Sequence, residues 1–342
     1  MAHEEPPRER GLPAVHKARE ARGKLRWPST KFWGYAGIIL TLSLILNWKW
    51  SQGRIESERQ KLMAKQRAVV VELGPKWTGL RDRVERWTLE LAKAPGQDVV
   101  DGEALKSWNF RQLPGLYLRL RVDEATSAEA IRKGAVGSLR DAFTSCLIRV
   151  PNPSPLAGAE CRHTRDCPQG EHCNENDRCS RPAQPFNLRV AYRTMHVLSD
   201  EWVRDAQEAS NELRLRVLDG SFDDTVRDDI PLAAELVTRA QYYLVVLDEP
   251  PEGAAPAAPG GASATEALLA VPHAARIGLW RLSDDKLVLR VRREANGQLV
   301  GGMAMVDVDV LGARQRQANS CGLALAVREA MGDTSAAATP PQ

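Results

Sequence analysis

Residues 276–293, RIGLWRLSDDKLVLRVRR, are the stretch of this 342-residue sequence that decides the fold class. Two apolar runs, near 276–282 and 286–293, flank the turn-forming residues Ser283 to Lys286 and predict a pair of strands. Asn296-Gly297 predicts a turn into a third strand, because both residues tolerate positive φ. Long strands with polar outward faces favour a largely antiparallel sheet with helices on one side, so the sequence predicts an α+β domain.

The flanking segments supply the rest of this domain, which we expect to span residues 110–332. Periodicity and capping signals predict half-exposed strands at 116–122 and 186–192, further strands at 147–150 and 242–247, and helices from Thr126 to about 143, from Ser199 to about 217, near 230–240 and at 313–331. The weak similarity between 116–150 and 186–247 leaves a ferredoxin-like duplication open. Residues 249–264, rich in Ala, Pro and Gly, indicate a flexible surface loop, and 333–342 a disordered tail.

The composition narrows the function classes. The 47 basic and 44 acidic side chains leave a net charge of +3, which is too balanced for a dedicated nucleic-acid-binding protein. A hydrophobic content of 43% excludes a wholly disordered chain. We therefore expect a folded protein with no nucleic-acid partner.

Residues 32–48, FWGYAGIILTLSLILNW, form an uncharged run between Lys31 and Lys49. Aromatic residues stand at both ends, and neither a small-residue cleavage site nor a cysteine follows, which disfavours a signal peptide and a lipoprotein. The pattern predicts a transmembrane helix at 32–50 with the lipid bilayer as a partner, after a disordered cytoplasmic tail at 1–31. The nearest basic residues favour a cytoplasmic N-terminus. We expect a single-pass protein of a bacterial inner membrane whose C-terminal domain is periplasmic.

Two sets of apolar residues at helical spacing follow, within a predicted helical stalk at 54–93. The first set is Ile55, Leu62, Val69 and Leu73, and the second is Trp77, Leu80, Val84, Trp87 and Leu91. Gly74-Pro75 lies between them and predicts a break into two helices, 54–73 and 76–93, because proline lacks a backbone donor. The seam could form a coiled coil that joins copies of the chain into a homo-oligomer. It could equally pack on the chain's own globular domain, since two heptads do not prove a coiled coil.

Four of the six cysteines lie in one short segment, CRHTRDCPQGEHCNENDRC, at Cys161, Cys167, Cys173 and Cys179. The surrounding stretch 151–185 has almost no aliphatic residues, so it cannot build a core, and two disulfides would hold it as an insertion. One alternative to disulfides is a zinc site, with His163 and His172 as additional ligands. A second alternative is that the thiols stay reduced. Gaps of five residues do not match structural zinc sites, whose paired cysteines lie two to four residues apart. We therefore expect disulfides, no metal ion, and exposed histidines.

This segment resembles the cysteine-rich repeats of the Dickkopf N-terminal type and related extracellular knuckles with a D-C-P-x-G-x-x-C core. The resemblance rests on Asp166, Cys167, Pro168, Gly170 and Cys173, with Cys161 and Cys179 outside them, and it covers residues 161–179 only. It implies an oxidising location and a pairing of Cys161 with Cys173 and of Cys167 with Cys179. Dickkopf modules have many more cysteines, so their signalling function is not implied.

Two cysteines remain outside the cluster, Cys146 and Cys321. Cys321 shares a helical face with apolar neighbours, and an even number of cysteines in an oxidising compartment favours pairing. We expect a Cys146–Cys321 bridge between the last helix and the 131–147 segment. Two independent buried thiols are the alternative.

Motifs for nucleotide binding, serine hydrolysis and zinc proteolysis are absent from the sequence. His196 and His273 have no evident partner, and Asp307 and Asp309 are explained as outward-facing strand residues. We expect no catalytic residue and no cofactor. The sequence favours a protein that acts by binding, as an envelope scaffold or sensor with a protein partner in the cell envelope. The alternative is an envelope enzyme of the hydrolase type with an unmarked site.

Overall fold

The computed structural model describes residues 29–106, 113–138, 142–148, 156–168, 171–174, 176–180, 185–251, 262–299 and 308–332. The tails expected at 1–31 and 333–342 and the loop expected at 249–264 lie wholly or mostly outside these residues. The chain divides into two compact units, residues 1–58 and 59–342. The second unit contains the sheet and the disulfides.

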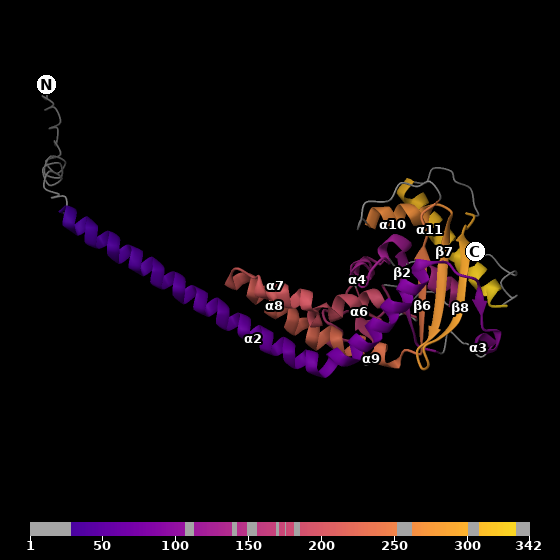
Figure 1. The fold of residues 1–342 in the computed structure, drawn as a ribbon, viewed down its shortest axis with the longest axis horizontal. Coiled ribbons are helices and arrows are strands. Elements are labelled where there is room, and N and C mark those ends of the chain that lie inside the picture. The colour runs from indigo at the N-terminus through magenta and orange to yellow at the C-terminus, as the bar shows by residue number, and fades with distance from the viewer. Residues whose placement is uncertain are drawn as a thin grey trace, which may run out of the picture. The chain divides into compact units, whose positions relative to one another are not determined.

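The centre of the second unit is a six-stranded sheet with the strand order β1-β8-β7-β6-β2-β5 (Figure 1). The strands are β1 (Val99–Val100), β2 (Gly115–Arg121), β5 (Phe186–Asn187), β6 (Tyr242–Asp248), β7 (His273–Arg281) and β8 (Lys286–Ala295). The predicted hairpin is confirmed, since β7 and β8 pair antiparallel around the expected turn. However, β2 runs parallel to both β5 and β6, so the sheet is mixed and the expectation of a largely antiparallel sheet is wrong.

The parallel strands have a topological cause. Between β2 and β6 the chain passes through the helices α4 (Ala128–Gly137), α5 (Phe143–Ile148), α6 (Leu188–Thr194), α7 (Asp200–Gln207), α8 (Glu212–Asp224) and α9 (Ile230–Arg239). A long helical connection lets the next strand re-enter the sheet in the same direction, whereas a tight hairpin cannot. All residues of β2 and of β6 are buried. The expectation of a half-exposed strand at 116–122 is therefore also wrong.

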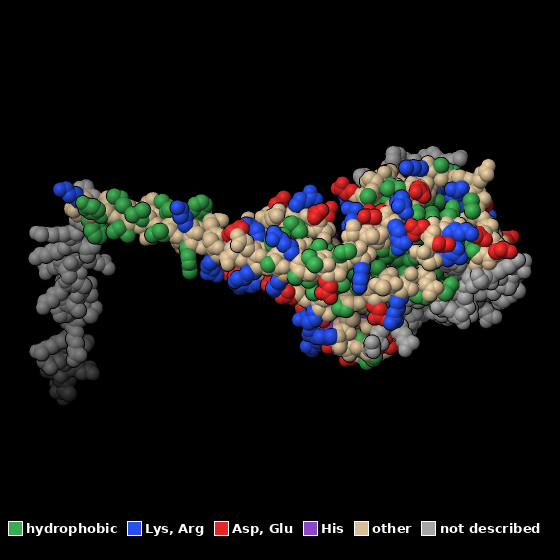
Figure 2. Space-filling model, turned by 60° about the horizontal axis from the view of Figure 1, so that its bottom comes forward, with side chains coloured by type: hydrophobic (Ala, Val, Ile, Leu, Met, Phe, Trp, Pro, Cys, Tyr) green, Lys and Arg blue, Asp and Glu red, His purple; other side chains and the backbone are tan. Residues whose placement is uncertain are grey.

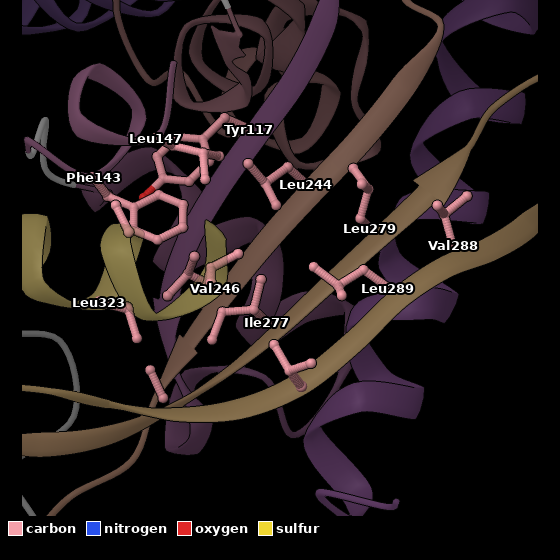
Figure 3. Packing of buried hydrophobic residues seen from close by; sticks show 14 of the residues in the cluster. Tyr117, Phe143, Leu147, Leu244, Val246, Ile277, Leu279, Val288, Leu289 and Leu323 are labelled. Atoms are coloured by element: carbon pink, nitrogen blue, oxygen red, sulfur yellow. The ribbon is translucent and has the colours of Figure 1, made fainter. Parts of the chain in front are cut away.

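Helices cover both faces of the sheet, which corrects the expectation of helices on one side. On one face, α5 and α11 (Val308–Ala330) enclose the main hydrophobic core. Figure 3 shows this core, in which side chains from the strands meet those of the two helices; the labelled residues are Tyr117, Phe143, Leu147, Leu244, Val246, Ile277, Leu279, Val288, Leu289 and Leu323. On the other face, Trp87 of the long helix α2 (Thr30–Lys93) stacks on Trp280 and Tyr243.

Helix α2 runs without a break through Gly74-Pro75, so the two predicted helices are one. Proline removes the bond that its nitrogen would have donated to the carbonyl of Val71. Val71 is 78% exposed, so solvent can satisfy that carbonyl and the helix can continue. The residues of the second set, Trp77, Leu80, Val84, Trp87 and Leu91, are all buried within the chain. Of the two interpretations of the seam, intramolecular packing is therefore the one that the structure shows.

No helix among the described residues combines the length and the apolar character needed to cross a membrane. This finding contradicts the transmembrane helix expected at 32–50. It also removes the inner-membrane location, the cytoplasmic N-terminus and the periplasmic placement of the C-terminal domain. The uncharged run covers about 26 Å of helix against a hydrocarbon core of about 30 Å, and it includes the polar Asn47. Its large hydrophobic side chains are exposed, as Figure 2 shows along this part of α2.

Several local elements differ from expectation. The predicted strand at 186–192 shortens to β5, because Asn187 caps α6 by accepting from the backbone of Arg189. The predicted strand at 147–150 starts inside α5, and its last two residues are not described. No strand follows Asn296-Gly297 among the described residues; instead, the Gly297 amide donates to Asn319 of α11 at 3.0 Å. Helix α11 begins at Val308, so Asp309 is helical, and Asp307 lies outside the described residues.

Candidate functional site

The cysteine-rich segment is a small module held by two disulfides. Cys161 pairs with Cys173 and Cys167 with Cys179, at Cα separations of 5.8 and 5.4 Å. These are the pairs that the resemblance implied, and a short antiparallel ladder of β3 (His172–Cys173) with β4 (Cys179–Ser180) lies between them. Sulfurs joined in disulfides are not thiolates, so with these two bonds formed the four cysteines do not offer the ligands of a structural zinc site. A third disulfide joins Cys146 of α5 to Cys321 of α11, with the Cα atoms 5.2 Å apart.

A groove lies between this module and the helices that follow it, and we call it the module groove. It has a volume of about 420 Å³ and is lined by Thr164, His172, Cys173, Asn174, Phe186, Val190, Arg193, Thr194, Thr225, Asp229, Leu232 and Ala233. The module contributes one wall, α6 another, and the junction of α8 with α9 the third. This volume falls within the range of about 300–1,000 Å³ that small-ligand pockets occupy.

The α8–α9 junction owes its shape to a proline. Residues Thr225–Asp229 form a π-helical turn, η4, and Pro231 follows in the first turn of α9. Proline cannot bond to the carbonyl four residues earlier and crowds it, so the turn widens by one residue. The widened turn presents Thr225 and Asp229 to the groove. π-turns of this kind are frequent at functional sites.

Helix α6 is held in place by a hydrogen bond to α2, which positions the side chains of α6 that line the groove. Tyr192 donates to the buried carboxylate of Glu85 on α2 at 3.2 Å, and Arg132 of α4 binds the same carboxylate through two bonds of 2.9 and 3.0 Å. Burial, together with the charge of Glu85, raises the pKa of Tyr192 well above its usual range. This network joins α2, α4 and α6. Val190 and Arg193 of α6 do not take part in it and line the groove.

The pKa values of two neighbouring carboxyl groups at the junction, Asp228 and Asp229, shift in opposite directions. Hydrogen bonds from Arg227, supported by the positive charges of Arg165 and His163, hold the pKa of the buried Asp228 below its usual range. The side chain of His163 approaches Asp228 to 3.6 Å and so ties the module to η4. Partial burial, added to the negative charges of Asp228 and Asp224, raises the pKa of Asp229.

A second cluster of polar groups lies under α11, at the carboxyl ends of β2 and β6. Arg119 donates from Nε and Nη2 to the two oxygens of Asp248, both at 2.7 Å, and from Nη1 to Ser320 at 2.9 Å. His273 directs Nε2 to Asp248 at 2.9 Å and Nδ1 to the Val271 carbonyl at 2.7 Å. All four side chains of this buried cluster are at least nine-tenths covered.

The buried cluster holds a serine, a histidine and an aspartate but not in a catalytic order. In a nucleophile–base pair the histidine takes a proton from the serine. Here both ring nitrogens of His273 face acceptors, and the Ser320 hydroxyl accepts from Arg119. The arrangement stabilises the end of the sheet and offers no activated nucleophile.

The structure thus redistributes the residues that the sequence singled out. His172 lines the module groove and His163 lies against Asp228, whereas both were expected as plain exposed loop residues. His273, expected without a partner, is bonded to Asp248, and His196 is exposed in η3 (Met195–Leu198). Sequence reasoning missed Arg193 and Asp229. The only local signal was the Asp-Asp-Ile-Pro run at 228–231, in which a proline follows two acids inside a helical pattern.

Comparison of the chain with protein-family models, curated proteins and solved structures finds no match.

Proposed function

We propose that this protein acts by binding a small ligand in the module groove, as a sensor or carrier of that ligand. The observation that carries the proposal is a groove whose lining combines the apolar side chains Phe186, Val190, Leu232 and Ala233 with one side chain of each charge, Arg193 and Asp229. Pockets that combine a hydrophobic lining with a few placed polar groups and a carboxyl of shifted pKa are typical of ligand sites. The disulfides support a fixed wall, since they hold the module without a core of its own.

Hydrolysis is the second candidate, and one observation favours it. The pKa values of Asp228 and Asp229 shift in opposite directions, which is the pattern of paired catalytic carboxyls. Binding is the better-supported function because only Asp229 lines the groove, while Asp228 is buried against Arg227. Turnover of ester or peptide substrates by the full chain that disappears in Asp229→Asn would favour hydrolysis instead.

The binding proposal is tested by filling the groove. Val190 is 39% exposed on the groove wall, so Val190→Trp adds bulk without disturbing a core. Equilibrium dialysis of the full chain against a pool of small metabolites, read by mass spectrometry, is expected to show retained compounds that Val190→Trp loses. Val217→Trp is the matched control, because Val217 is 63% exposed on α8 and does not line the groove. Retention of nothing by the full chain, or equal retention by both variants, would overturn the proposal.

A further inference from the structure

We propose that the ligand of the module groove is a zwitterion with an apolar body, an apolar α-amino acid or a short peptide, whose carboxylate pairs with Arg193 and whose ammonium pairs with Asp229. This inference rests on the proposed function and names its ligand class. This ligand class is inferred from the charged residues, the apolar lining residues and the volume of the groove.

Arg193 provides the site for the carboxylate. Its side chain lines the groove and makes no hydrogen bond or ion pair with any of the described residues. Most other arginines in this part of the chain are paired, as Arg227 is with Asp224 and Asp228. A guanidinium carries a planar set of donors that matches a carboxylate through two parallel bonds.

Asp229 provides the site for the ammonium. Partial burial and then the negative charges of Asp228 and Asp224 raise the pKa of Asp229, and its carboxylate forms no ion pair with a described residue. Arg165 and His163 of the module are directed to Asp228, and Arg227 binds Asp224 and Asp228. An incoming ammonium would relieve the repulsion among these acids, whereas an incoming anion would increase it.

Arg193 and Asp229 share the groove but do not neutralise each other. Both side chains line the groove, and no hydrogen bond or ion pair joins them. Each charge is therefore left to a ligand that carries the opposite charge at each end.

The apolar part of the lining sets the body of the ligand. Phe186, Val190, Leu232 and Ala233 supply apolar surface, and Thr164, Thr194 and Thr225 also line the groove. An aliphatic side chain would lose water contact on this surface, while threonine hydroxyls can bond to a peptide group. A volume of about 420 Å³ accommodates either a single amino acid or a dipeptide.

Isothermal titration calorimetry of the full chain tests the inference with two probes, L-leucine and L-leucyl-L-leucine. Saturable binding of either is expected, and the stronger of the two identifies the source as a free amino acid or a peptide. N-acetyl-L-leucine amide has the same apolar body without the charges and is expected to bind at least about tenfold more weakly, because both charge-assisted contacts are lost.

Variants assign the two contacts. Arg193→Ala and Asp229→Asn are expected to weaken binding at least about tenfold each. Arg204→Ala and Asp205→Asn are the matched controls, since both residues are exposed on α7 away from the groove, and they are expected to leave the affinity unchanged.

Two results would overturn the inference. Equal binding of the uncharged amide would show that the charges are not used. Absence of binding by both probes, with other metabolites still retained by the full chain and lost in Val190→Trp, would reject the zwitterion while the proposed function stands. If no metabolite is retained either, the proposed function itself fails.

Discussion

Asp248 is a buried carboxylate whose two oxygens are shared between Arg119 and His273. Burial alone would raise the pKa of this carboxyl, but the charge of Arg119 and the hydrogen bonds from His273 and Arg119 outweigh it and hold the pKa below its usual range. The folded protein therefore binds a proton at Asp248 less readily than the unfolded chain does. This residue stabilises the fold fully above the unfolded pKa, about 3.9, and progressively less as the pH falls below it.

Replacement of Asp248 leaves the charge of Arg119 buried without its partner. We expect Asp248→Asn to lower the free energy of unfolding at neutral pH by about 3–5 kcal/mol, measured by urea denaturation. The difference between the two proteins should shrink as the pH falls below about 4. Asp284→Asn is the control, because its pair with Arg281 is exposed and solvent screens such pairs, so they contribute little to stability. A loss for Asp248→Asn as small as that of the control would contradict the role of the cluster.

The pKa of Asp229 shifts in the opposite direction to that of Asp248. Because its pKa is raised in the folded protein, the ionised carboxyl destabilises the fold, and this cost grows as the pH rises through the unfolded and then the folded pKa. Asp229→Asn is expected to raise the melting temperature at neutral pH and to have no effect near pH 3. The gain should stay below about 1 kcal/mol, since the side chain keeps solvent contact that screens its charge. A lower melting temperature at neutral pH would show that Asp229 has a stabilising partner.

For single residues, the sequence predicted a partner only where the number of cysteines was informative. Cys146 and Cys321 are 175 positions apart, yet an even number of cysteines was enough to pair them. The partners of Arg119 were not predicted, because an arginine in a strand has many possible acids and Asp248 lies 129 positions away. Arg193 and Asp229 line one groove through the packing of α6, η4 and the module, and no local sequence pattern encodes that arrangement.

Among the elements, the C-terminal half of α2 packs on the sheet through buried aromatic side chains. Trp87 is 3% exposed and stacks on Trp280 with ring centroids 5.6 Å apart. Trp87→Ala should lower the free energy of unfolding by about 3–5 kcal/mol in urea denaturation, through lost burial and a cavity between α2 and the sheet. Trp50→Ala serves as the control with almost no effect, because Trp50 is 67% exposed. A change of oligomer mass without a loss of stability would revive the coiled-coil interpretation of this seam.

Helix starts were predicted better than strand lengths. Ser199 caps α7 as expected, and the capping signal at Thr126–Glu129 is off by a single residue, since Ser127 is the cap of α4. Caps are local, so their side-chain bonds can be inferred from neighbouring residues. The alternation at 186–192 was misleading, because Asn187 starts a helix after only two strand residues. The long helix predicted from Ser199 is interrupted, as Asn211 provides a second cap for α8.

For the whole molecule, the sequence predicted the α+β class but not the order of the strands. The β7–β8 hairpin is encoded by its own turn, whereas the parallel pairing of β2 with β6 joins strands separated by the helices α4 to α9 and by the cysteine-rich module. That same excursion brings the module and η4 together and creates the groove. The site therefore depends on topology, which residue patterns do not specify.

The central claim, that the module groove binds an apolar zwitterion, is tested most directly by hydrogen–deuterium exchange of the full chain with and without saturating L-leucyl-L-leucine. Slower exchange is expected in residues 171–174, 186–194 and 225–233, since a bound ligand restrains all three walls together. Strands β2, β6 and β7, which carry the buried cluster, should exchange at the same rate in both states. Unchanged exchange in the three wall segments, or protection confined to the buried cluster, would contradict the account.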